Sequence, residues 1–236
     1  MSFLIAVHVN EGIVLASDRR TTYTNTINEN GRQVVSIGVH TTNSTDKTFV
    51  CPNGAGISTC GEASLLNKPI TGYIQEMIRT KISPDTNISV ISQIIIDYFY
   101  NQPIVPNTNF IIAGYETVGD KKVQKLFRVQ LANKKVEEIN TDTQGAFWDG
   151  ETHTLTRLIQ NVAVEDANGK FTALPFEEIL WNYFTLQDAI DFARFSVETT
   201  INTMRFKKVV ETVGGSIDIL VITPDKTKWV QREELR

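Results

Sequence analysis

Short, largely apolar segments alternate with polar turns over the first sixty residues. Residues 3–9 form one such segment, Asn10–Gly12 has turn composition, and a second segment at 13–17 ends before the charged triplet 18–20. This pattern predicts a hairpin of two buried β-strands. Two further short strands are expected nearby, at Thr48–Cys51 and Ile57–Cys60.

Four stretches have the apolar spacing of an amphipathic helix. The first runs from Leu65 to Ile78, where Pro69 indicates either a late start or a kink. The second, 88–100, follows the capping-rich segment 83–87, and a third is expected over 153–162. The fourth begins at the capping-box pattern Thr185–Asp188, and its apolar face continues to Met204. Further strands are predicted at Asn109–Tyr115, Lys125–Gln130, Lys135–Ile139, Ile217–Thr223 and Lys228–Val230.

The order of these elements is strands, two helices, strands, two helices, strands. A doubly wound parallel sheet would alternate strand and helix one by one, so the order favours two mainly antiparallel sheets packed together with helix pairs outside them. The expected fold is therefore α+β, a four-layer αββα sandwich, formed as a single domain over residues 1–236. The polar stretch between the first hairpin and residue 46 is expected to lie on the surface.

Composition narrows the class of protein. Hydrophobic residues make up 41% and charged residues 21%, as in soluble globular chains, and the net charge of −4 argues against a nucleic-acid partner. No apolar run is long enough for a signal peptide or a membrane span, so a cytoplasmic protein without a membrane partner is expected. Two cysteines and three histidines, without metal-ligand spacing, predict neither a disulfide framework nor a metal site. Gly54 and Gly56 lack the third glycine of a dinucleotide loop, so no cofactor is expected.

The candidate chemistry lies at the amino terminus. If Met1 is removed, Ser2 carries both a hydroxyl nucleophile and a free α-amine, whose ordinary pKa near 8 lets it accept the hydroxyl proton at neutral pH. This is the chemistry of an N-terminal nucleophile (Ntn) hydrolase. A Met-Ser start is common, and the predicted hairpin matters because it would fix Ser2 within a sheet.

The sequence resembles the β-type subunits of the proteasome and their bacterial relatives among the Ntn hydrolases. The resemblance rests on five segments: Gly12–Thr22, Asp46–Phe49, Ser58–Ala63, Gly114–Tyr115 and Gly215–Thr223. It implies that Ser2 is the nucleophile, that Lys47 lowers the pKa of the Ser2 amine and hydroxyl, and that the Gly61 N–H serves the oxyanion hole. Asp18 would hold Lys47, and Arg20 would brace Asp18 by a bidentate pair. Taken singly, Asp18, Lys47 and Gly61 are read more simply as a turn carboxylate, an exposed lysine and a helix-entry glycine.

The sequence departs from the family pattern in four places. Serine replaces threonine at Ser2, and the longer interval between Asp18 and Lys47 indicates a surface insertion at 21–46. The third and fourth departures change polar positions: Gln144–Ala146 stands where Gly-Ser-Gly is expected, and Val210 and Val213 stand where an aspartate and a serine support the nucleophile. Glu211 would replace that aspartate only if the chain shifts by one residue.

Three functions remain open on these residues. The first is a proteasome-like threonine/serine-type peptidase that hydrolyses peptide bonds with Ser2. The second is a catalytically silent, ring-forming subunit, and the third is an Ntn amidase acting on a small amide. The expected partners are a polypeptide or small-amide substrate and further copies of the chain in a homo-oligomeric ring. An ATP-dependent unfoldase is left open.

Overall fold

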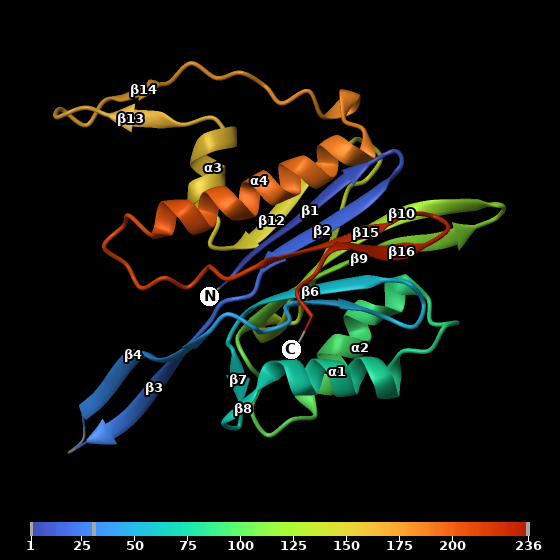
Figure 1. The fold of residues 1–236 in the computed structure, drawn as a ribbon, viewed down its shortest axis with the longest axis horizontal. Coiled ribbons are helices and arrows are strands. Elements are labelled where there is room, and N and C mark those ends of the chain that lie inside the picture. The colour runs from blue at the N-terminus through green and yellow to red at the C-terminus, as the bar shows by residue number, and fades with distance from the viewer. Residues whose placement is uncertain (1, 30–31, 235–236) are drawn as a thin grey trace.

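The computed structural model describes residues 2–29 and 32–234. Within them the chain forms four α-helices and two five-stranded antiparallel sheets, joined by smaller two-stranded pairs (Figure 1). The fold is therefore a mixed α/β fold built on antiparallel sheets.

The first sheet has the strand order β12-β1-β2-β15-β16. Its strands are β1 (Phe3–Val9), β2 (Gly12–Asp18), β12 (Gly145–Gly150), β15 (Ile217–Ile222) and β16 (Thr227–Gln231). Every residue of β1 and β2 is buried, because β12 and β15 flank this central hairpin. The predicted hairpin is confirmed, and Ser2 directly precedes its first strand.

The second sheet has the order β11-β10-β9-β6-β5. Its strands are β5 (Thr48–Val50), β6 (Gly56–Gly61), β9 (Thr108–Val118), β10 (Lys121–Gln130) and β11 (Lys135–Ile139), with the short 3₁₀-helix η1 (Leu131–Asn133) between the last two. A buried apolar cluster joins residues of both sheets, among them Leu4 and Leu15 of the first and Ile111 and Leu126 of the second. The two sheets therefore pack face to face through this cluster.

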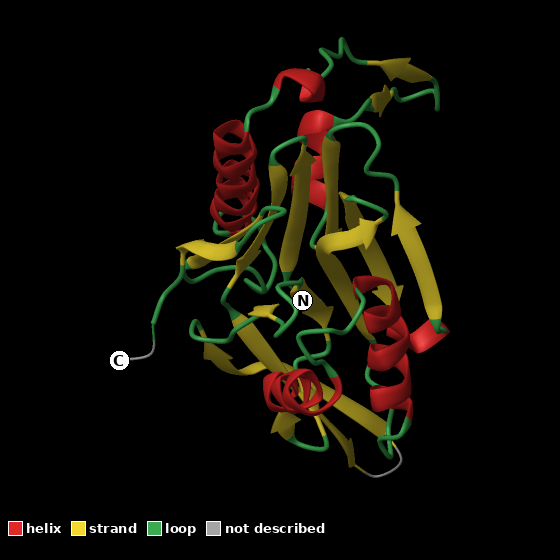
Figure 2. Ribbon diagram, turned by 90° about the vertical axis from the view of Figure 1, so that its right-hand side faces the viewer, coloured by secondary structure: helices red, strands yellow, loops and turns green. Residues whose placement is uncertain are grey.

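The helices pack in pairs against different sheets. Helices α1 (Ile70–Lys81) and α2 (Ile88–Tyr100) share a buried cluster with the second sheet, whereas α3 (His153–Ile159) and α4 (Leu186–Met204) share one with the first. Figure 2 shows strands running between the two groups of helices. The predicted caps are confirmed: Asn87 accepts a hydrogen bond from the Ser89 N–H, and Thr185 forms a capping box with Asp188.

Of the two alternatives for the first helix, the late start is confirmed, whereas the predicted end of the third helix at residue 162 is wrong. Residues 64–69 form a two-stranded turn, β7 (Ser64–Leu65) and β8 (Lys68–Pro69), rather than the start of the first helix. Leu66 and Asn67 have positive φ angles of 51° and 60°, which a helix does not accept, and Pro69 is the residue before the late helix start. The third helix ends at Ile159, because Gln160 is already extended.

A long ribbon occupies most of the polar segment before residue 46. It pairs β3 (Thr21–Glu29) with β4 (Arg32–Thr42) and extends away from the sheets (Figure 1). Its base, at Thr21 and Thr22, is buried next to the amino terminus. On the opposite side of the molecule lie β13 (Ala163–Glu165), β14 (Phe171–Ala173) and the 3₁₀-helix η2 (Trp181–Tyr183).

Candidate active site

The amino-terminal hairpin places Ser2 in a buried position. Its exposed fraction is 6%, and its carbonyl oxygen accepts a hydrogen bond from the Glu151 N–H at 2.8 Å. Gly150, which pairs with Phe3, has φ +88°, and a Cβ there would lie 1.9 Å from the Ser2 oxygen. Only glycine permits this close approach of β12 to Ser2. Met1, whose removal the proposed chemistry requires, lies outside the described residues.

Asp18 ends β2 with both carboxylate oxygens engaged. Oδ1 accepts from the Phe3 N–H at 3.1 Å and from Lys47 Nζ at 2.8 Å. Oδ2 accepts from the N–H groups of Arg20 and Gly214 at 3.0 and 2.9 Å. The side chain is fully buried, so these four donors replace the water that an ionised carboxylate requires. Because one of the donors is Phe3, Asp18 is fixed to the residue that follows Ser2.

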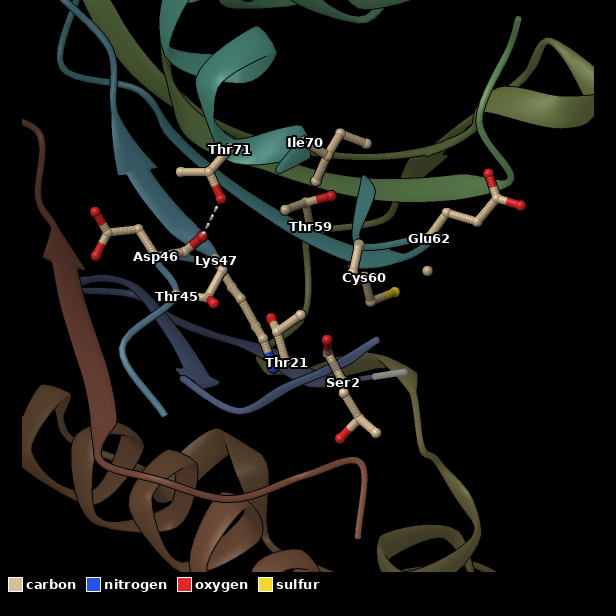
Figure 3. Close-up of a pocket in the computed structure, with 13 residues that line it drawn as sticks. Ser2, Thr21, Thr45, Asp46, Lys47, Thr59, Cys60, Glu62, Ile70 and Thr71 are labelled. Atoms are coloured by element: carbon tan, nitrogen blue, oxygen red, sulfur yellow. Dashed lines mark hydrogen bonds between the residues drawn. The ribbon is translucent and has the colours of Figure 1, made fainter. Parts of the chain in front are cut away.

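Lys47 reaches the site from the second sheet. It directly precedes β5, is 3% exposed, and donates from Nζ to Asp18 and to the backbone oxygen of Arg20. Burial lowers the pKa of the Lys47 ammonium, while the neighbouring Asp18 carboxylate acts in the opposite direction. Figure 3 shows the end of the Lys47 side chain and the Ser2 side chain facing the same part of a pocket. Ser2 and Lys47, which is paired with Asp18, therefore line the same pocket.

Gly61, at the end of β6, lines the same pocket. Its φ is +123°, and a Cβ would lie 2.4 Å from the Asn107 oxygen and 2.8 Å from the Thr108 Cα. The turn therefore requires glycine at this position. Ser2, Lys47 and Gly61, which are far apart in the sequence, line one cavity.

Solved structures of Anbu share this fold. Anbu from Hyphomicrobium sp. strain MC1 superposes with a TM-score of 0.58 at 15% identity, over 98% of this chain and 88% of that one. A Gly-1 mutant of the same Anbu gives 0.57 at 16% identity, over 98% and 86%, respectively. Anbu from Yersinia bercovieri, described as an ancestral beta-subunit, gives 0.55 at 13% identity, over 98% and 88%. No protein-family model and no curated protein matches the chain.

The expected bidentate pair between Arg20 and Asp18 is wrong. Within the described residues, Arg20 reaches Asp18 through its backbone N–H alone. Its side chain turns outward, where Nε donates to Asn43 Oδ1 at 2.9 Å and the guanidinium pairs with Glu211. Glu211 is 44% exposed and is used in this surface pair, so the geometry does not favour it as the replacement for the missing aspartate.

The buried arginine beside the site is Arg19, which the sequence analysis passed over. It is 1% exposed, and one guanidinium nitrogen lies 2.8 Å from both Asp46 Oδ1 and Asp218 Oδ2. Its backbone oxygen accepts from the Thr45 N–H at 3.1 Å. Arg19 thus ties the segment before Lys47 to β15.

The sequence patterns also did not single out a polar contact between Thr212 and Glu151. Thr212 is 7% exposed and its hydroxyl donates to Glu151 Oε1 at 3.2 Å. Glu151 in turn contacts the Ser2 backbone. The segment Gln144–Ala146, which the sequence comparison set against the family's Gly-Ser-Gly, lies away from Ser2, because Gly145 pairs with His8 at the far end of β1. The segment beside Ser2 is that of Gly150 and Glu151, and local composition gave no signal of it.

Other features of the sequence have simple structural places. Cys51 and Cys60 are free and buried, and Cys60 lines the pocket. In the described ranges 2–29 and 32–234, the side chains of His, Cys, Asp and Glu form no cluster suited to a metal ion. None of the helices in the described part of the chain has the length and apolar character needed to cross a bilayer.

Proposed function

We propose that the chain is a proteasome-like Ntn hydrolase with a four-layer αββα sandwich, in which Ser2 becomes the nucleophile once Met1 has been removed. The observation that carries this proposal is the buried ion pair in which Asp18 Oδ1 and Lys47 Nζ lie 2.8 Å apart. The same carboxylate accepts the Phe3 N–H, so the pair is fixed relative to the nucleophile. The similarity of the fold to Anbu over 98% of the chain supports the sandwich.

The chemistry begins with the hydroxyl of mature Ser2, which attacks the carbonyl carbon of an amide. The α-amine of the same residue accepts the hydroxyl proton, directly or through water, and passes it to the leaving amine as the C–N bond breaks. Water then hydrolyses the acyl ester. Lys47 supplies the positive charge that favours the neutral amine and the alkoxide. The Gly61 N–H stabilises the tetrahedral oxyanion, a role whose loss typically lowers the rate by ~10²–10³.

The pair Thr212 and Glu151 supports this proposal. The sequence has Val210 and Val213 where the family has polar groups, and this absence argued for a silent protein. Glu151 donates its N–H to the Ser2 oxygen and accepts from the Thr212 hydroxyl, so a carboxylate and a hydroxyl are present on this side of Ser2. We propose that these two residues orient the amine of mature Ser2.

Two alternatives each have a specific observation in their favour. Val210 is 44% exposed and Val213 is buried with the apolar residues near α4, which fits a ring-forming subunit without chemistry. The pocket beside Ser2 has a volume of about 30 Å³, which fits an amidase for small amides. A homo-oligomeric ring remains part of the proposal in each case, and an ATP-dependent unfoldase would serve only the peptidase.

The proposal is tested by peptide hydrolysis with the untagged, assembled protein. Ser2→Ala and Lys47→Met should each reduce the rate by at least about 10²-fold, whereas the matched variants Ser64→Ala and Lys68→Met, at exposed positions, should retain it. Size-exclusion chromatography of each variant establishes that assembly is unchanged. Full activity in Lys47→Met would refute the mechanism. Intact assembly without any Ser2-dependent hydrolysis of peptides or small amides would favour the silent subunit.

A further inference from the structure

The backbone at Ser2 is held from two sides. The N–H of the following residue, Phe3, donates to Asp18 at 3.1 Å, and the carbonyl oxygen of Ser2 accepts from the Glu151 N–H at 2.8 Å. The first contact belongs to the ion pair at the end of β2. The second depends on the turn at Gly150, where the chain leaves β12. The position of Ser2 therefore depends on the groups that fix this turn.

Asp149 fixes the turn through its side chain. Its Oδ1 accepts from the Gly150 N–H at 2.7 Å, and its Oδ2 accepts from Arg128 Nε at 2.8 Å and from Asn109 Nδ2 at 3.1 Å. Arg128 lies on β10 and Asn109 on β9, so these contacts join the turn to the second sheet. Asp149 is 6% exposed, and the three donors take the place of water around its carboxylate.

Arg128 is itself packed against the core between the sheets. Its guanidinium carbon lies 5.7 Å from the centroid of the Phe147 ring, which belongs to the apolar cluster that joins the two sheets. A fully exposed ion pair contributes little, because two long side chains must be held in one geometry against solvent. Here the packing against the ring and the burial of the carboxylate restrict both partners. The pair of Arg128 and Asp149 therefore provides a fixed anchor for the turn.

The same turn adjoins the pocket at Ser2. A Cβ built on Gly150 would lie 3.5 Å from the Cβ of Cys60, a residue that lines this pocket together with Ser2. The contacts therefore form a series. Asp149 bonds to Gly150, and the next residue along the chain, Glu151, bonds to the nucleophile.

We propose that Asp149 is a positioning residue of the Ser2 site: anchored on Arg128, it acts through the Glu151 N–H to hold the backbone of Ser2. The inference rests on the proposed function and adds a residue that acts through another. Displacement of a reacting group by about 1 Å costs up to about 10²-fold in rate. Loss of the anchor should therefore slow the reaction of Ser2, while the residues that bind the ligand stay in place.

The first test is Asp149→Asn, which keeps the shape of the side chain and replaces one acceptor with a donor. Whichever way the amide is placed, its NH₂ group faces either the Gly150 N–H or the donors of Arg128 and Asn109, so contacts are lost on one side. The loosened turn should make amide hydrogen exchange at Glu151 at least about tenfold faster.

The reaction is followed with a peptide epoxyketone, a reagent that adds to the hydroxyl and the amine of an N-terminal residue, on the untagged, assembled protein. In Asp149→Asn the maximal rate of adduct formation on Ser2 should fall by about 10²-fold, and the half-saturating concentration should change by less than about threefold. Asp191→Asn is the matched control, because it breaks a pair with Arg194 at an exposed position on α4. It should leave the rate and the exchange unchanged.

A second substitution should restore the turn. In Asp149→Asn/Arg128→Met, the new amide accepts from Gly150 with its oxygen and donates to Asn109, whose own amide turns its oxygen inward. Every donor of the turn is then paired again although the charge pair is gone. The rate of adduct formation and the exchange at Glu151 should return to within about fivefold of the parent. A residue that acted only through its charge would not be rescued in this way.

Circular dichroism establishes that each variant is folded at the assay temperature. If Asp149→Asn does not fold, Asn109→Ala takes its place, because it removes the longest of the three contacts and keeps the ion pair. It should lower the rate of adduct formation by about three- to tenfold.

An unchanged rate in a folded Asp149→Asn or Asn109→Ala would overturn the inference and leave the proposed function standing. A rate that the double variant does not recover, or a change confined to the half-saturating concentration, would do the same. A parent protein that neither hydrolyses peptides nor forms the adduct on Ser2 would overturn the proposed function and the inference with it.

Discussion

Removal of the guanidinium of Arg19 should destabilise the fold strongly. In Arg19→Met, Asp46 and Asp218 both lose a partner at 2.8 Å, and the fully buried Asp218 keeps a weak contact with the Glu233 N–H at 3.4 Å. Leaving such a carboxylate uncompensated costs about 3–5 kcal/mol. For a chain of this length, that corresponds to a fall in the unfolding temperature of about 6–20 °C. Arg157→Met, at an exposed arginine, should change the stability by less than about 0.5 kcal/mol.

The loss should be recovered when the second charge is also removed. In Arg19→Met/Asp218→Leu, apolar side chains of similar size replace the buried pair, an exchange that is often neutral or stabilising. Arg19 Nε has no hydrogen-bond partner among the described residues, so the parent already carries one unsatisfied donor that the double variant removes. Asp46 retains Arg232 at 3.6 Å in that variant.

The destabilisation should also depend on pH. Burial raises the pKa of Asp218, and Arg19 lowers it again. Without Arg19 the pKa lies still further above its unfolded value, so the folded state binds more protons and stability falls as the pH rises through that range. Urea unfolding of the parent, single and double variants at pH 5 and pH 8 measures these effects. A single variant within about 1 kcal/mol of the parent, or a double variant as unstable as the single one, would refute the reasoning.

Three further predictions concern single positions. Gly61→Ala should cost more than about 1 kcal/mol, since the left-handed backbone and the contact with Asn107 both resist a Cβ; chemical denaturation measures the loss. Burial lowers the pKa of His8, so the unfolded state binds a proton more readily than the folded state. The stability of the fold should therefore decrease as the pH drops below about 6.5, and unfolding curves from pH 8 to pH 5 measure this slope. Burial raises the pKa of Cys51 to about 12 and that of Cys60 further. Both thiols should therefore react slowly with a disulfide reagent at pH 8 until the protein unfolds, and the absorbance of the released thiol measures the rate.

Each of these predictions has its own control. Gly72→Ala, in α1 with open space around it, should stabilise the fold, and equal effects at both glycines would contradict the strain at Gly61. His8→Gln should abolish the pH dependence and His153→Gln, at an exposed position, should not. A thiol that reacts rapidly in the folded protein would contradict the burial of the cysteines.

The elements that the sequence predicted correctly depend on local patterns. Residues 3–17 read as a hairpin because a turn separates two apolar runs, and α2 and α4 start where Asn87 and Thr185 supply caps. The late start of α1 was ambiguous, since apolar spacing alone does not reveal the positive φ of Leu66. The sequence predicted a surface position for the segment that forms β3 and β4 but not its two strands, because its polar residues lack a strand-like alternation of apolar side chains.

Predictions for the site depended on the resemblance more than on local pattern. Ser2, Lys47 and Gly61 meet only through the packing of two sheets, which no local spacing encodes. The side chain of Arg20 was misassigned because the choice between an inward and an outward arginine depends on Glu211, far along the chain. The same holds for the contact between Glu151 and Ser2, which depends on the register of β1 against β12.

The central claim, that Ser2 is an activated N-terminal nucleophile, is tested most directly by the intact mass of the untagged protein before and after incubation with a peptide epoxyketone. This reagent adds to a hydroxyl and an adjacent amine, so both groups must belong to one residue. The account predicts loss of Met1 followed by one adduct per chain, mapped to Ser2 and absent from Lys47→Met. Retained Met1, or a free Ser2 that never forms the adduct, would contradict the account.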